Sequence, residues 1–469
     1  METLFSNISE FTLYTIIPFI VLLGILIFVH EFGHFITAKL SGVKVEIFAL
    51  GFGPWLFHKK RGDTDYGLKA IPLGGFVKVL GDPSEMEDPE KEIPPEDMDR
   101  ALFNKPIWKR LIFFAAGSAM NLVLAFAVAP FVYIHGIERS YYNDIAPCDV
   151  GYVEPDSPAD QAGILPGDRV RTINGEPVEN FANLRILEAQ NPGRVLAYHL
   201  ERGDTVFEAE IKLAVGSREP VGYSGILEPQ YGTTIGNIIP DLPAEAAGLR
   251  KGDKILSING SPVSHWYEIT ALIQAGEGNP LSLTVLSDGR EESFELTPKY
   301  MKEYNKYMVG IGPYDHMVLV RYGFLKACRA GFQEVIRWTV MTLVIVKKLF
   351  TLELSWRAVS GPAGIAGITG VAAHLGLSHL IWLLALISLN LAILNMLPIP
   401  PLDGAHVFIT CIESIIRREM KMKWKEAIFR AGFALLLAFI ALVTVNDIYR
   451  FRGPIVEWFK EIGRGLGLG

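Results

Sequence analysis

Four long apolar stretches decide what this chain of 469 residues can fold into. A helix needs about 20 consecutive apolar residues to cross the hydrocarbon core of a bilayer. The stretches that reach or approach this length with their apolar flanks are 11–29, 111–134, 375–396 and 431–445. A fifth stretch, 338–346, is closed by Arg337 and Lys347 and is too short to cross. We therefore expect a polytopic α-helical membrane protein with four transmembrane helices, and we interpret 322–350 as an amphipathic helix at the membrane interface.

The composition agrees with a membrane protein and excludes several other classes. Charged residues make up 20% of the chain and hydrophobic residues 50%, whereas a soluble globular chain carries about 25% charged residues. The formal net charge of −7 provides no basic surface for nucleic acid. The three cysteines, Cys148, Cys328 and Cys411, are odd in number and far apart. A wholly soluble protein, a nucleic-acid binder, a disulfide scaffold and a cysteine zinc cluster are therefore excluded.

Basic residues near the crossings predict the orientation, because they concentrate on the cytoplasmic side of a membrane. The two short connections carry most of them: Lys39, Lys44, Lys59, Lys60, Arg61, Lys105, Lys109 and Arg110, then Arg417, Arg418, Lys421, Lys423, Lys425 and Arg430. Both connections are predicted to face the cytoplasm, with the termini and the long middle segment outside. Lys347, Lys348 and Arg357 on the outer side are exceptions. The acidic N-terminus, with Glu2 and Glu10, predicts a retained anchor instead of a cleaved signal peptide.

The segment from about 145 to 315 contains an internal repeat in which residues recur 85 positions further on, as Gly151 recurs at Gly236. The paired motifs are Ala162-Gly163 and Ala247-Gly248, Gly167-Asp168 and Gly252-Asp253, and Ile173-Asn174-Gly175 and Ile258-Asn259-Gly260. Each copy is predicted to form a helical turn that ends at a glycine, an apolar strand after Gly-Asp, and a tight hairpin turn at Asn-Gly. The chain therefore holds two copies of one module.

The repeated pattern, A-G-x-x-x-G-D-x-(V/I)-x-x-I-N-G-x-P-V, resembles that of PDZ domains, which are α+β folds. In the permuted bacterial order, this resemblance places the peptide-receiving strand last in each copy, next to Gly225 and Ile226 and next to Gly310 and Ile311. These four residues are candidate substrate-binding residues, where an extended substrate or adaptor peptide would add as a strand. The alternative is that the two domains are steric spacers whose grooves are unused.

His30-Glu31-Phe32-Gly33-His34 follows the first apolar stretch, at the predicted cytoplasmic end of its helix. Histidines four positions apart lie on one helical face, so both imidazoles can bind one metal ion. Glu31 lies beside them and can reach a metal-bound water, which is the H-E-x-x-H arrangement of zinc hydrolases. The alternative is an incidental polar helix end. Ionisable groups beside an uninterrupted apolar run are costly unless they bind or react, which favours a metal site.

A catalytic zinc site usually has three protein ligands and keeps its fourth position for water. Asp403 is the candidate third ligand, because prolines at 398, 400 and 401 must break the helix of the third crossing just before it. Irregular backbone at membrane depth is tolerated only where it is buried in protein or lines a wet cavity. The predicted topology brings this break to the same depth as His30 and His34. The alternative role for Asp403 is a turn or cap residue after the break.

Together, His30-Glu31-x-x-His34, Asn395-x-x-Pro398-x-Pro400-x-Leu402-Asp403-Gly404 and the tandem insert resemble the site-2 proteases, which are intramembrane zinc metalloproteases. The resemblance covers nearly the whole chain. The segments 51–54 and 66–75 resemble the cytoplasmic membrane-reentrant β region of that family, and 360–365 resembles its segment before the third crossing. The chain departs from the family pattern at Ser118, where a proline is common, and at Ala405, where a second glycine is usual.

The resemblance implies one zinc ion held by His30, His34 and Asp403, with Glu31 as the catalytic acid and base. It implies a role for Asn395 in substrate binding; Asn390 is a second candidate, with helix–helix contact as the alternative for both. A strand edge within 66–79 would hold an unwound substrate, although glycine and proline there are also typical of turns. The segment 82–99 is interpreted as a solvated acidic linker.

The expected activity is hydrolysis of single-span membrane proteins within or near their transmembrane segment. By resemblance, a first protease trims the external domain, and the substrates are of the anti-sigma factor class, with remnant signal peptides as a second class. The protein would lie in the bacterial inner membrane, with its PDZ domains in the periplasm and its active site toward the cytoplasm. The rival functions are an inactive membrane scaffold that binds partners through its PDZ pair, and a zinc hydrolase acting on soluble or lipid substrates.

The predicted organisation is a first transmembrane helix with the zinc motif (1–40), a cytoplasmic β region and acidic linker (41–100), a second transmembrane helix (101–138), PDZ domain 1 (139–230), PDZ domain 2 (231–315), an amphipathic interfacial region (316–370), a third transmembrane helix with the Leu-Asp-Gly motif (371–415), and a basic loop, fourth transmembrane helix and tail (416–469).

Overall fold

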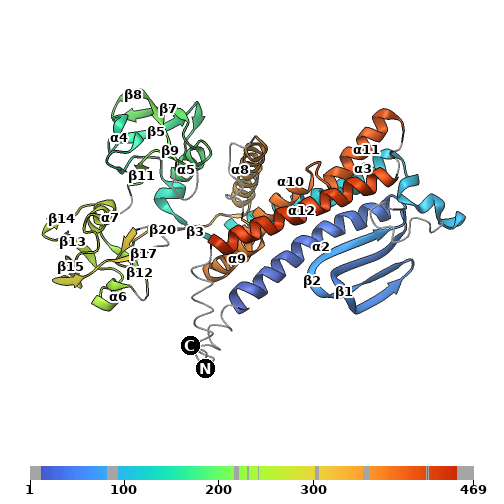
Figure 1. Ribbon diagram of the computed structural model, residues 1–469, viewed down its shortest axis with the longest axis horizontal. Coiled ribbons are helices and arrows are strands. Elements are labelled where there is room, and N and C mark those ends of the chain that lie inside the picture. The colour runs from blue at the N-terminus through green and yellow to red at the C-terminus, as the bar shows by residue number, and fades with distance from the viewer. Residues whose placement is uncertain are drawn as a thin grey trace. The chain divides into compact units, whose positions relative to one another are not determined.

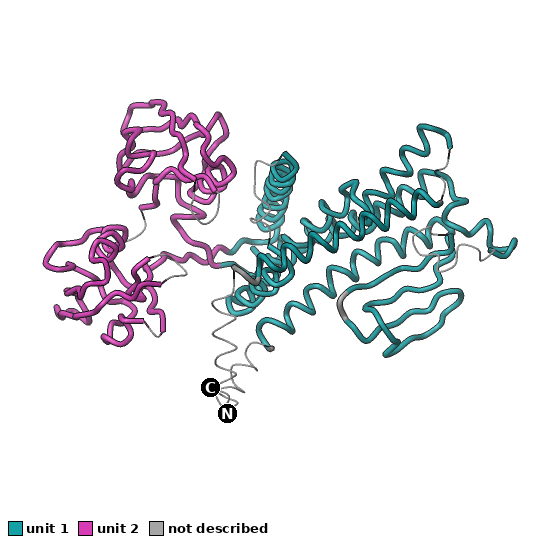
Figure 2. Tube along the Cα trace, in the orientation of Figure 1, with its two compact units in different colours: residues 1–137, 321–469 teal, residues 138–320 magenta. Residues whose placement is uncertain are grey.

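The computed structural model describes residues 12–81, 93–215, 221–229, 232–240, 242–301, 306–351, 360–418, 420 and 422–450. The chain forms two compact units, one built from residues on both sides of an insertion and the other from the insertion itself, Glu138–Val320 (Figure 2). Most of the predicted acidic linker, 82–92, lies outside the described residues, as do Glu2, Glu10, Arg357, Lys421 and the tail after 450.

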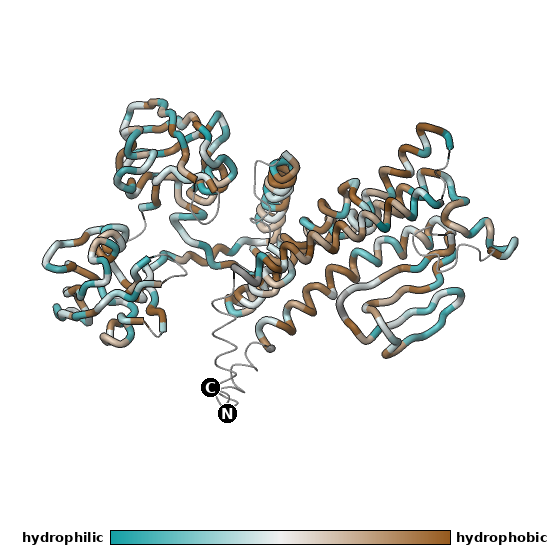
Figure 3. Tube along the Cα trace, viewed as in Figure 1, coloured by the Kyte–Doolittle hydropathy of each residue, from teal (hydrophilic) through white to brown (hydrophobic). Residues whose placement is uncertain are grey.

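The first unit contains four helices that are long and apolar enough to cross a membrane, which confirms the predicted number for the described residues. They are α2 (Ile17–Leu40), α3 (Ile107–His135), α10 (Leu377–Asn395) and α12 (Met422–Arg450) (Figure 1). A π-helical turn, Thr12–Ile16, precedes α2. Apolar residues run along these helices (Figure 3), and many large ones are exposed, such as Leu435 at 67%. Exposed apolar side chains in this number need hydrocarbon around them.

The first helix runs through the zinc motif to Leu40, the end of the predicted segment 1–40, because Phe35-Ile36-Thr37-Ala38 holds no residue that breaks a helix. The helices differ from the sequence-based prediction at one place. The third apolar segment is preceded by a separate helix, α9 (Pro362–Leu375), which the sequence analysis did not predict. Gly376, with φ +104°, separates α9 from α10. Apolar side chains continue through this bend, so hydropathy alone could not reveal it.

The first unit also contains α8 (Phe324–Phe350) and α11 (Asp403–Ile416), and two short 3₁₀ helices, Pro95–Arg100 and Leu102–Asn104, come before α3. The predicted helix at 322–350 is therefore present. At Gly331 of α8 a Cβ would lie 2.7 Å from the backbone nitrogen of Pro130, so α8 packs closely on α3. At α12, Asp447 accepts a hydrogen bond of 2.8 Å from the backbone N–H of Gly364 and so ties α12 to α9.

A curved hairpin, β1 (Val45–Arg61) and β2 (Thr64–Val79), packs beside α2 (Figure 1). The two strands fold back on themselves, so that the sheet consists of four strand segments, which we call ribbons. Ala49 pairs with both Phe76 and Gly67, and Lys60 pairs with Asp65. The ribbon 75–79 is therefore one edge of the sheet, and the ribbon 57–61 is the other. The first of these edges lies against α2, where Val45, Val77 and Val79 share a core with residues of α2 and α3.

The second unit contains two four-stranded sheets with the same strand order. The first repeat contains β5 (Arg169–Ile173), β6 (Glu176–Pro177), β7 (Val195–Arg202) and β8 (Thr205–Lys212) in the order β6-β5-β7-β8, with α4 (Pro158–Gln161) and α5 (Phe181–Ala189). The second repeat contains β13 (Lys254–Ile258), β14 (Ser261–Pro262), β15 (Leu281–Ser287) and β16 (Arg290–Leu296) in the order β14-β13-β15-β16, with α6 (Pro243–Ala247) and α7 (Trp266–Ala275). Each copy therefore has the predicted helical turn and apolar strand.

Short strand pairs complete the second unit. They are β4 (Tyr152–Val153) with β11 (Ile226–Leu227), β12 (Ile235–Ile238) with β19 (Ile311–Pro313), β3 (Ile137–Ser140) with β20 (Met317–Val320), β9 (Ala214–Val215) with β10 (Gly222–Tyr223), and β17 (Lys299–Met301) with β18 (Lys306–Met308).

The two repeats adopt the same backbone conformations at their turns. Asn174 and Gly175 have φ +50° and +80°, and Asn259 and Gly260 have +50° and +76°. Positive φ at both central residues is the hairpin turn that Asn-Gly favours, so this prediction is confirmed. Gly225 and Gly310 come directly before β11 and β19 with φ +90° and +89°. A side chain at Gly225 would overlap Ser157, so both backbone angle and space require glycine there.

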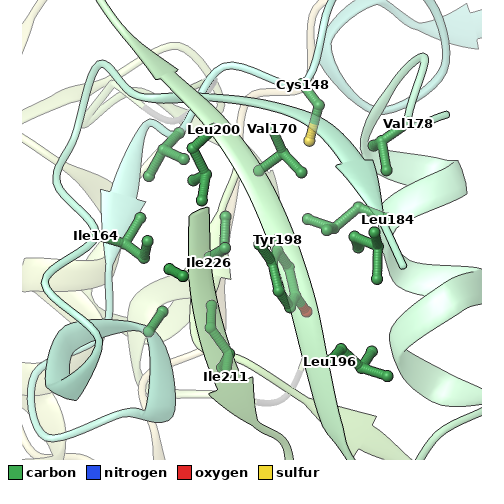
Figure 4. Packing of buried hydrophobic residues seen from close by; sticks show 14 of the residues in the cluster. Cys148, Ile164, Val170, Val178, Leu184, Leu196, Tyr198, Leu200, Ile211 and Ile226 are labelled. Carbon is green, nitrogen blue, oxygen red and sulfur yellow. The ribbon is translucent and has the colours of Figure 1, made fainter. Parts of the chain in front are cut away.

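The repeats differ at one buried position. Tyr198 lies among the buried hydrophobic residues of the first core (Figure 4). Glu188 is 1% exposed, and its Oε1 accepts hydrogen bonds from Tyr198 Oη at 3.0 Å and from Ser224 Oγ at 2.5 Å. Burial raises the pKa of Glu188 above its ordinary value, against the hydrogen bond from Ser224 and the charge of Arg185. In the second repeat the corresponding residues are Ile273, Leu283 and Val309, which belong to an apolar core. The first repeat therefore carries a polar network where the second packs only hydrocarbon.

This network predicts a non-additive response to mutation. Glu188→Leu should lower the free energy of local unfolding of the first repeat by about 1–3 kcal/mol, because two buried hydroxyls lose their acceptor. Glu188→Leu combined with Tyr198→Phe should be less destabilised than the sum of the two single variants. Amide hydrogen exchange of 195–212 in the full chain measures this. Strictly additive losses would show that the carboxylate and the phenol act independently.

Candidate metal centre and active site

Three potential metal ligands from opposite ends of the chain meet in the first unit. His30 and His34 lie on one face of α2, and Asp403 is the first residue of α11. Asp403 Oδ2 is 3.2 Å from His30 Nε2 and 3.4 Å from His34 Nε2, and the two Nε2 atoms are 3.4 Å apart. All three side chains are largely buried. The sequence-based expectation that the break after the third crossing brings Asp403 to the two imidazoles agrees with this geometry.

The chain reverses sharply between α10 and α11 to present Asp403. Prolines 398, 400 and 401 end the helical hydrogen bonding after Asn395. A Cβ at Gly404 would overlap the carbonyl of Met396, so only glycine allows this close return of the backbone. Gly432 of α12 in turn packs on Pro400, where a Cβ would lie 2.5 Å from Pro400 Cβ. Asp403 lies in the first turn of α11, where the helix dipole favours a negative charge.

Neighbouring groups orient both imidazoles toward Asp403. His34 Nδ1 lies 2.8 Å from the carbonyl oxygen of Phe113, which can only accept, so Nδ1 carries the proton and Nε2 keeps its lone pair. The amide of Asn121 lies 3.4 Å from His30 Nδ1, and its Oδ1 is buried without a hydrogen-bond partner among the described residues. If the Asn121 amide is rotated by 180°, its oxygen and nitrogen exchange places with almost no change of shape. Oδ1 then accepts the proton of His30 Nδ1, which leaves Nε2 of His30 free as a ligand.

Two glycines that the sequence analysis did not single out allow α3 to approach the site. At Gly117 of α3 a Cβ would lie 2.6 Å from His30 Nε2 and would overlap His34 Nε2. At Gly33 of α2 a Cβ would overlap the carbonyl of Ala116. Small residues let membrane helices come this close. The run Ala115-Ala116-Gly117-Ser118 in the second crossing was the available signal, but it does not say what the glycine faces.

The residues present fit a zinc ion. Among the described residues, no hydrogen-bond donor is assigned to the buried Asp403 Oδ2, which faces two imidazole nitrogens that carry lone pairs in the tautomers assigned above. Three buried lone pairs directed at one point are unfavourable unless a cation lies between them. The ligand atoms lie within 4.8 Å of one another. Two histidines and one carboxylate are a donor set of catalytic zinc sites, which keep one open position.

The other predicted site residues lie at different distances from this centre. Glu31 follows His30 on α2, and a Cβ at Gly75 would lie 3.2 Å from Glu31 Cγ, so Glu31 adjoins the sheet edge 75–79. Asn395 is the last residue of α10, directly before the break. Asn390 accepts a hydrogen bond of 2.9 Å from Thr342 of α8, which agrees with the helix-contact alternative. Gly225, Ile226, Gly310 and Ile311 belong to the second unit.

A family model and curated relatives match this chain over nearly its whole length. The model of peptidase family M50 matches residues 18–439. A protein named as a zinc metalloprotease in Neisseria meningitidis serogroup A is 32% identical over 94% of this chain and 100% of its own. The regulator of sigma-E protease RseP of Salmonella typhimurium is 30% identical over 93% of this chain and 99% of its own. Among solved structures, a PDZ domain from Listeria monocytogenes matches 18% of this chain and 94% of its own, with 20% identity and a TM-score of 0.17.

A cluster of two histidines and a carboxylate on apolar helices, together with these relatives, defines a zinc metalloprotease. The chain belongs to peptidase family M50, the site-2 protease family.

The packing of α3 predicts that Gly117→Ala loses zinc. The added methyl group would occupy the space beside both Nε2 atoms, and we expect zinc affinity to fall by about 10–100-fold, as it does when groups that orient the ligands are disturbed. Elemental analysis of the purified full chain measures this. Gly24→Ala in α2 is the matched control, because a Cβ there meets nothing within 4 Å. Full zinc content in Gly117→Ala would contradict the geometry described above.

Proposed function

We propose that the protein is an intramembrane protease that hydrolyses single-span membrane proteins within or near their transmembrane segment. The observation that carries this proposal is the position of His30 and His34. Both lie within Leu13–Leu40, one of the helices apolar enough to cross a membrane, and Asp403 reaches them from the break after another. A site built into such helices is accessible to a substrate that is itself in the bilayer.

His30, His34 and Asp403 would hold the zinc ion. Zinc bound there supplies Lewis-acid chemistry: it lowers the pKa of water toward neutrality and polarises a peptide carbonyl. Glu31, adjacent to His30 on α2, accepts the proton of the attacking water and returns it to the leaving amine. The Phe113 carbonyl and the Asn121 amide hold the two imidazoles in the tautomer that this requires. Asn395, at the end of α10, is the candidate for binding the substrate backbone.

A transmembrane substrate must unwind before its peptide bonds can be attacked, because helical hydrogen bonds occupy its carbonyls. The edge ribbon 75–79 of β2 offers replacement partners by strand addition. Its position supports this role, since Gly75 adjoins Glu31. The opposite edge, 57–61, belongs to the same sheet but is separated from it by two ribbons.

The two repeats of the second unit are proposed to be PDZ domains that lie outside the cytoplasm, in the periplasm of an inner-membrane protein. Basic residues in the two short connections support this orientation. The repeats would exclude substrates with a large external domain, so that an earlier protease must trim them. Relatives named regulator of sigma-E protease support substrates of the anti-sigma factor class, and remnant signal peptides are a second class.

The central test is Glu31→Gln in the full chain, reconstituted in liposomes with a single-span substrate tagged at both ends. The variant should keep its zinc, because Glu31 is not one of the three clustered ligands, and should cleave about 10²–10⁴-fold more slowly. A zinc chelator should stop cleavage by the wild type. Mass spectrometry of the products locates the cut.

The outcomes separate the three functions. Equal cleavage by wild type and Glu31→Gln, or none by either, would favour a scaffold. Cuts only outside the membrane segment would favour a zinc hydrolase acting on soluble or lipid substrates.

The edge-strand proposal predicts which sheet edge contacts the substrate. A photo-crosslinking phenylalanine analogue at position 76, on the ribbon 75–79, should crosslink to the substrate trapped by Glu31→Gln. The same analogue in place of Phe57, which is 67% exposed on the opposite edge, should not. Immunoblots of the crosslinked products measure both. Crosslinking at 57 but not at 76 would refute strand addition beside Glu31.

A further inference from the structure

A second polar site lies in the first unit, where the start of α3 meets the end of α11. It is a cavity of about 550 Å³. Among the described residues that line it, the charged ones are four cations, Lys105, Arg110, Arg417 and Arg418, and one carboxylate, Glu413. The metal centre uses none of these side chains, because its ligands come from α2 and from the opposite end of α11.

The single carboxylate already has its partners within the protein. Glu413 accepts hydrogen bonds from Lys425 Nζ at 2.6 Å and from the backbone N–H of Met420 at 2.8 Å, and Arg110 Nη2 lies 3.4 Å away. Burial raises the pKa of Glu413, but these donors more than offset it and hold the pKa below its ordinary value. Glu413 therefore stays charged and fixes α3, α11 and α12 to one another, and its charge is already matched by Lys425 and Arg110.

The other three cations of the cavity differ from Arg110: within the part of the chain that the structure describes, no ion pair joins Lys105, Arg417 or Arg418 to a carboxylate. Burial, and to a smaller extent the neighbouring Lys109, lower the pKa of Lys105, while Asp99 acts in the opposite direction. Thr410 and Ser414 add hydroxyl groups to the lining. The cavity therefore offers positive charge and hydrogen-bond donors, which together suit a phosphate-sized anion.

The backbone at the end of α11 favours a role for Arg417 in this cavity. Arg417 has φ +54° in the left-handed region, at the position that ends the helix. Glycine is the usual residue there, because a Cβ makes this conformation unfavourable. An arginine at this position carries its side chain into the lining of the cavity despite that cost.

The residues near the cavity are of the kinds that occur at the level of lipid head groups. Trp108 and Trp424 are 59% and 65% exposed, and tryptophan prefers the interface between hydrocarbon and water. Ile415 and Ile416, directly before Arg417, are 82% and 65% exposed and need an apolar surrounding. Basic pockets between membrane helices on the cytoplasmic side are a known kind of site for anionic lipid head groups.

We propose that this cavity binds the phosphodiester head group of an anionic phospholipid, with Lys105, Arg417 and Arg418 as its contacts. The acyl chains would lie along the exposed apolar face that includes Ile415 and Ile416. A soluble phosphate ion has the same charge chemistry but gains nothing from that face, which favours the lipid. The cavity takes no part in proteolysis, so this proposal can fail without affecting the function proposed above.

The test measures lipid retention by native mass spectrometry of the full chain in detergent. The lipid is phosphatidylglycerol, with zwitterionic phosphatidylcholine as the comparison. The variant Arg417→Gln/Arg418→Gln should bind phosphatidylglycerol about 30-fold more weakly than wild type, because each basic residue near a lipid surface contributes about fivefold. Lys59→Gln/Lys60→Gln, which removes the same charge from the edge ribbon 57–61, should bind as wild type does. Unchanged zinc content shows that each variant is folded.

Three results would overturn the proposal. The first is equal retention of phosphatidylglycerol by wild type and Arg417→Gln/Arg418→Gln. The second is an equal loss in both double variants, which would show a response to net charge alone. The third is displacement of the lipid by millimolar inorganic phosphate together with no preference for phosphatidylglycerol over phosphatidylcholine, which would assign the cavity to a soluble anion.

Discussion

The structure depends on the convergence of three buried lone pairs inside a bundle of apolar helices. His30, His34 and Asp403 come from segments far apart in the chain, and their ligand atoms meet within 4.8 Å. Such a cluster is unfavourable in an apolar surrounding unless a cation joins it. The backbone around it is arranged accordingly: Gly117 leaves room beside the imidazoles, and Gly404 lets the chain return after the proline break. A zinc ion bound there would therefore stabilise this cluster of polar atoms as well as supply its chemistry.

The sequence predicted those parts of the site that depend on spacing along one helix or on a single strong breaker. The four-residue spacing of His30 and His34 and the prolines before Asp403 are of this kind. The count of membrane-length helices followed from segment length. Gly117, the Phe113 carbonyl and helix α9 were missed, because they depend on how helices dock and on a bend within continuous apolar sequence. Pairing of Asn390 with Thr342 was likewise a property of helix contact and not of either residue's type.

The duplicated module shows how two copies with the same strand order acquire different interiors. Their shared turns at Asn174 and Asn259 are set by local backbone angles and have stayed alike. Their cores have diverged at Glu188, which holds two hydroxyls beneath β11, whereas Ile273 in the other copy packs on hydrocarbon. The copies are therefore not interchangeable, and a role found for the groove of one does not transfer to the other.

The contact between Gly432 and Pro400 makes the last crossing part of the metal centre without giving it a ligand. Helix α12 has few buried residues of its own and meets the rest of its unit at a small number of close points, among them Asp447 with Gly364 and Gly432 with Pro400. At the second of these contacts, Gly432 packs on Pro400, which belongs to the turn that presents Asp403. A helix that supplies no ligand therefore supports the position of the Asp403 carboxylate, and a larger residue at position 432 would displace the backbone that carries it.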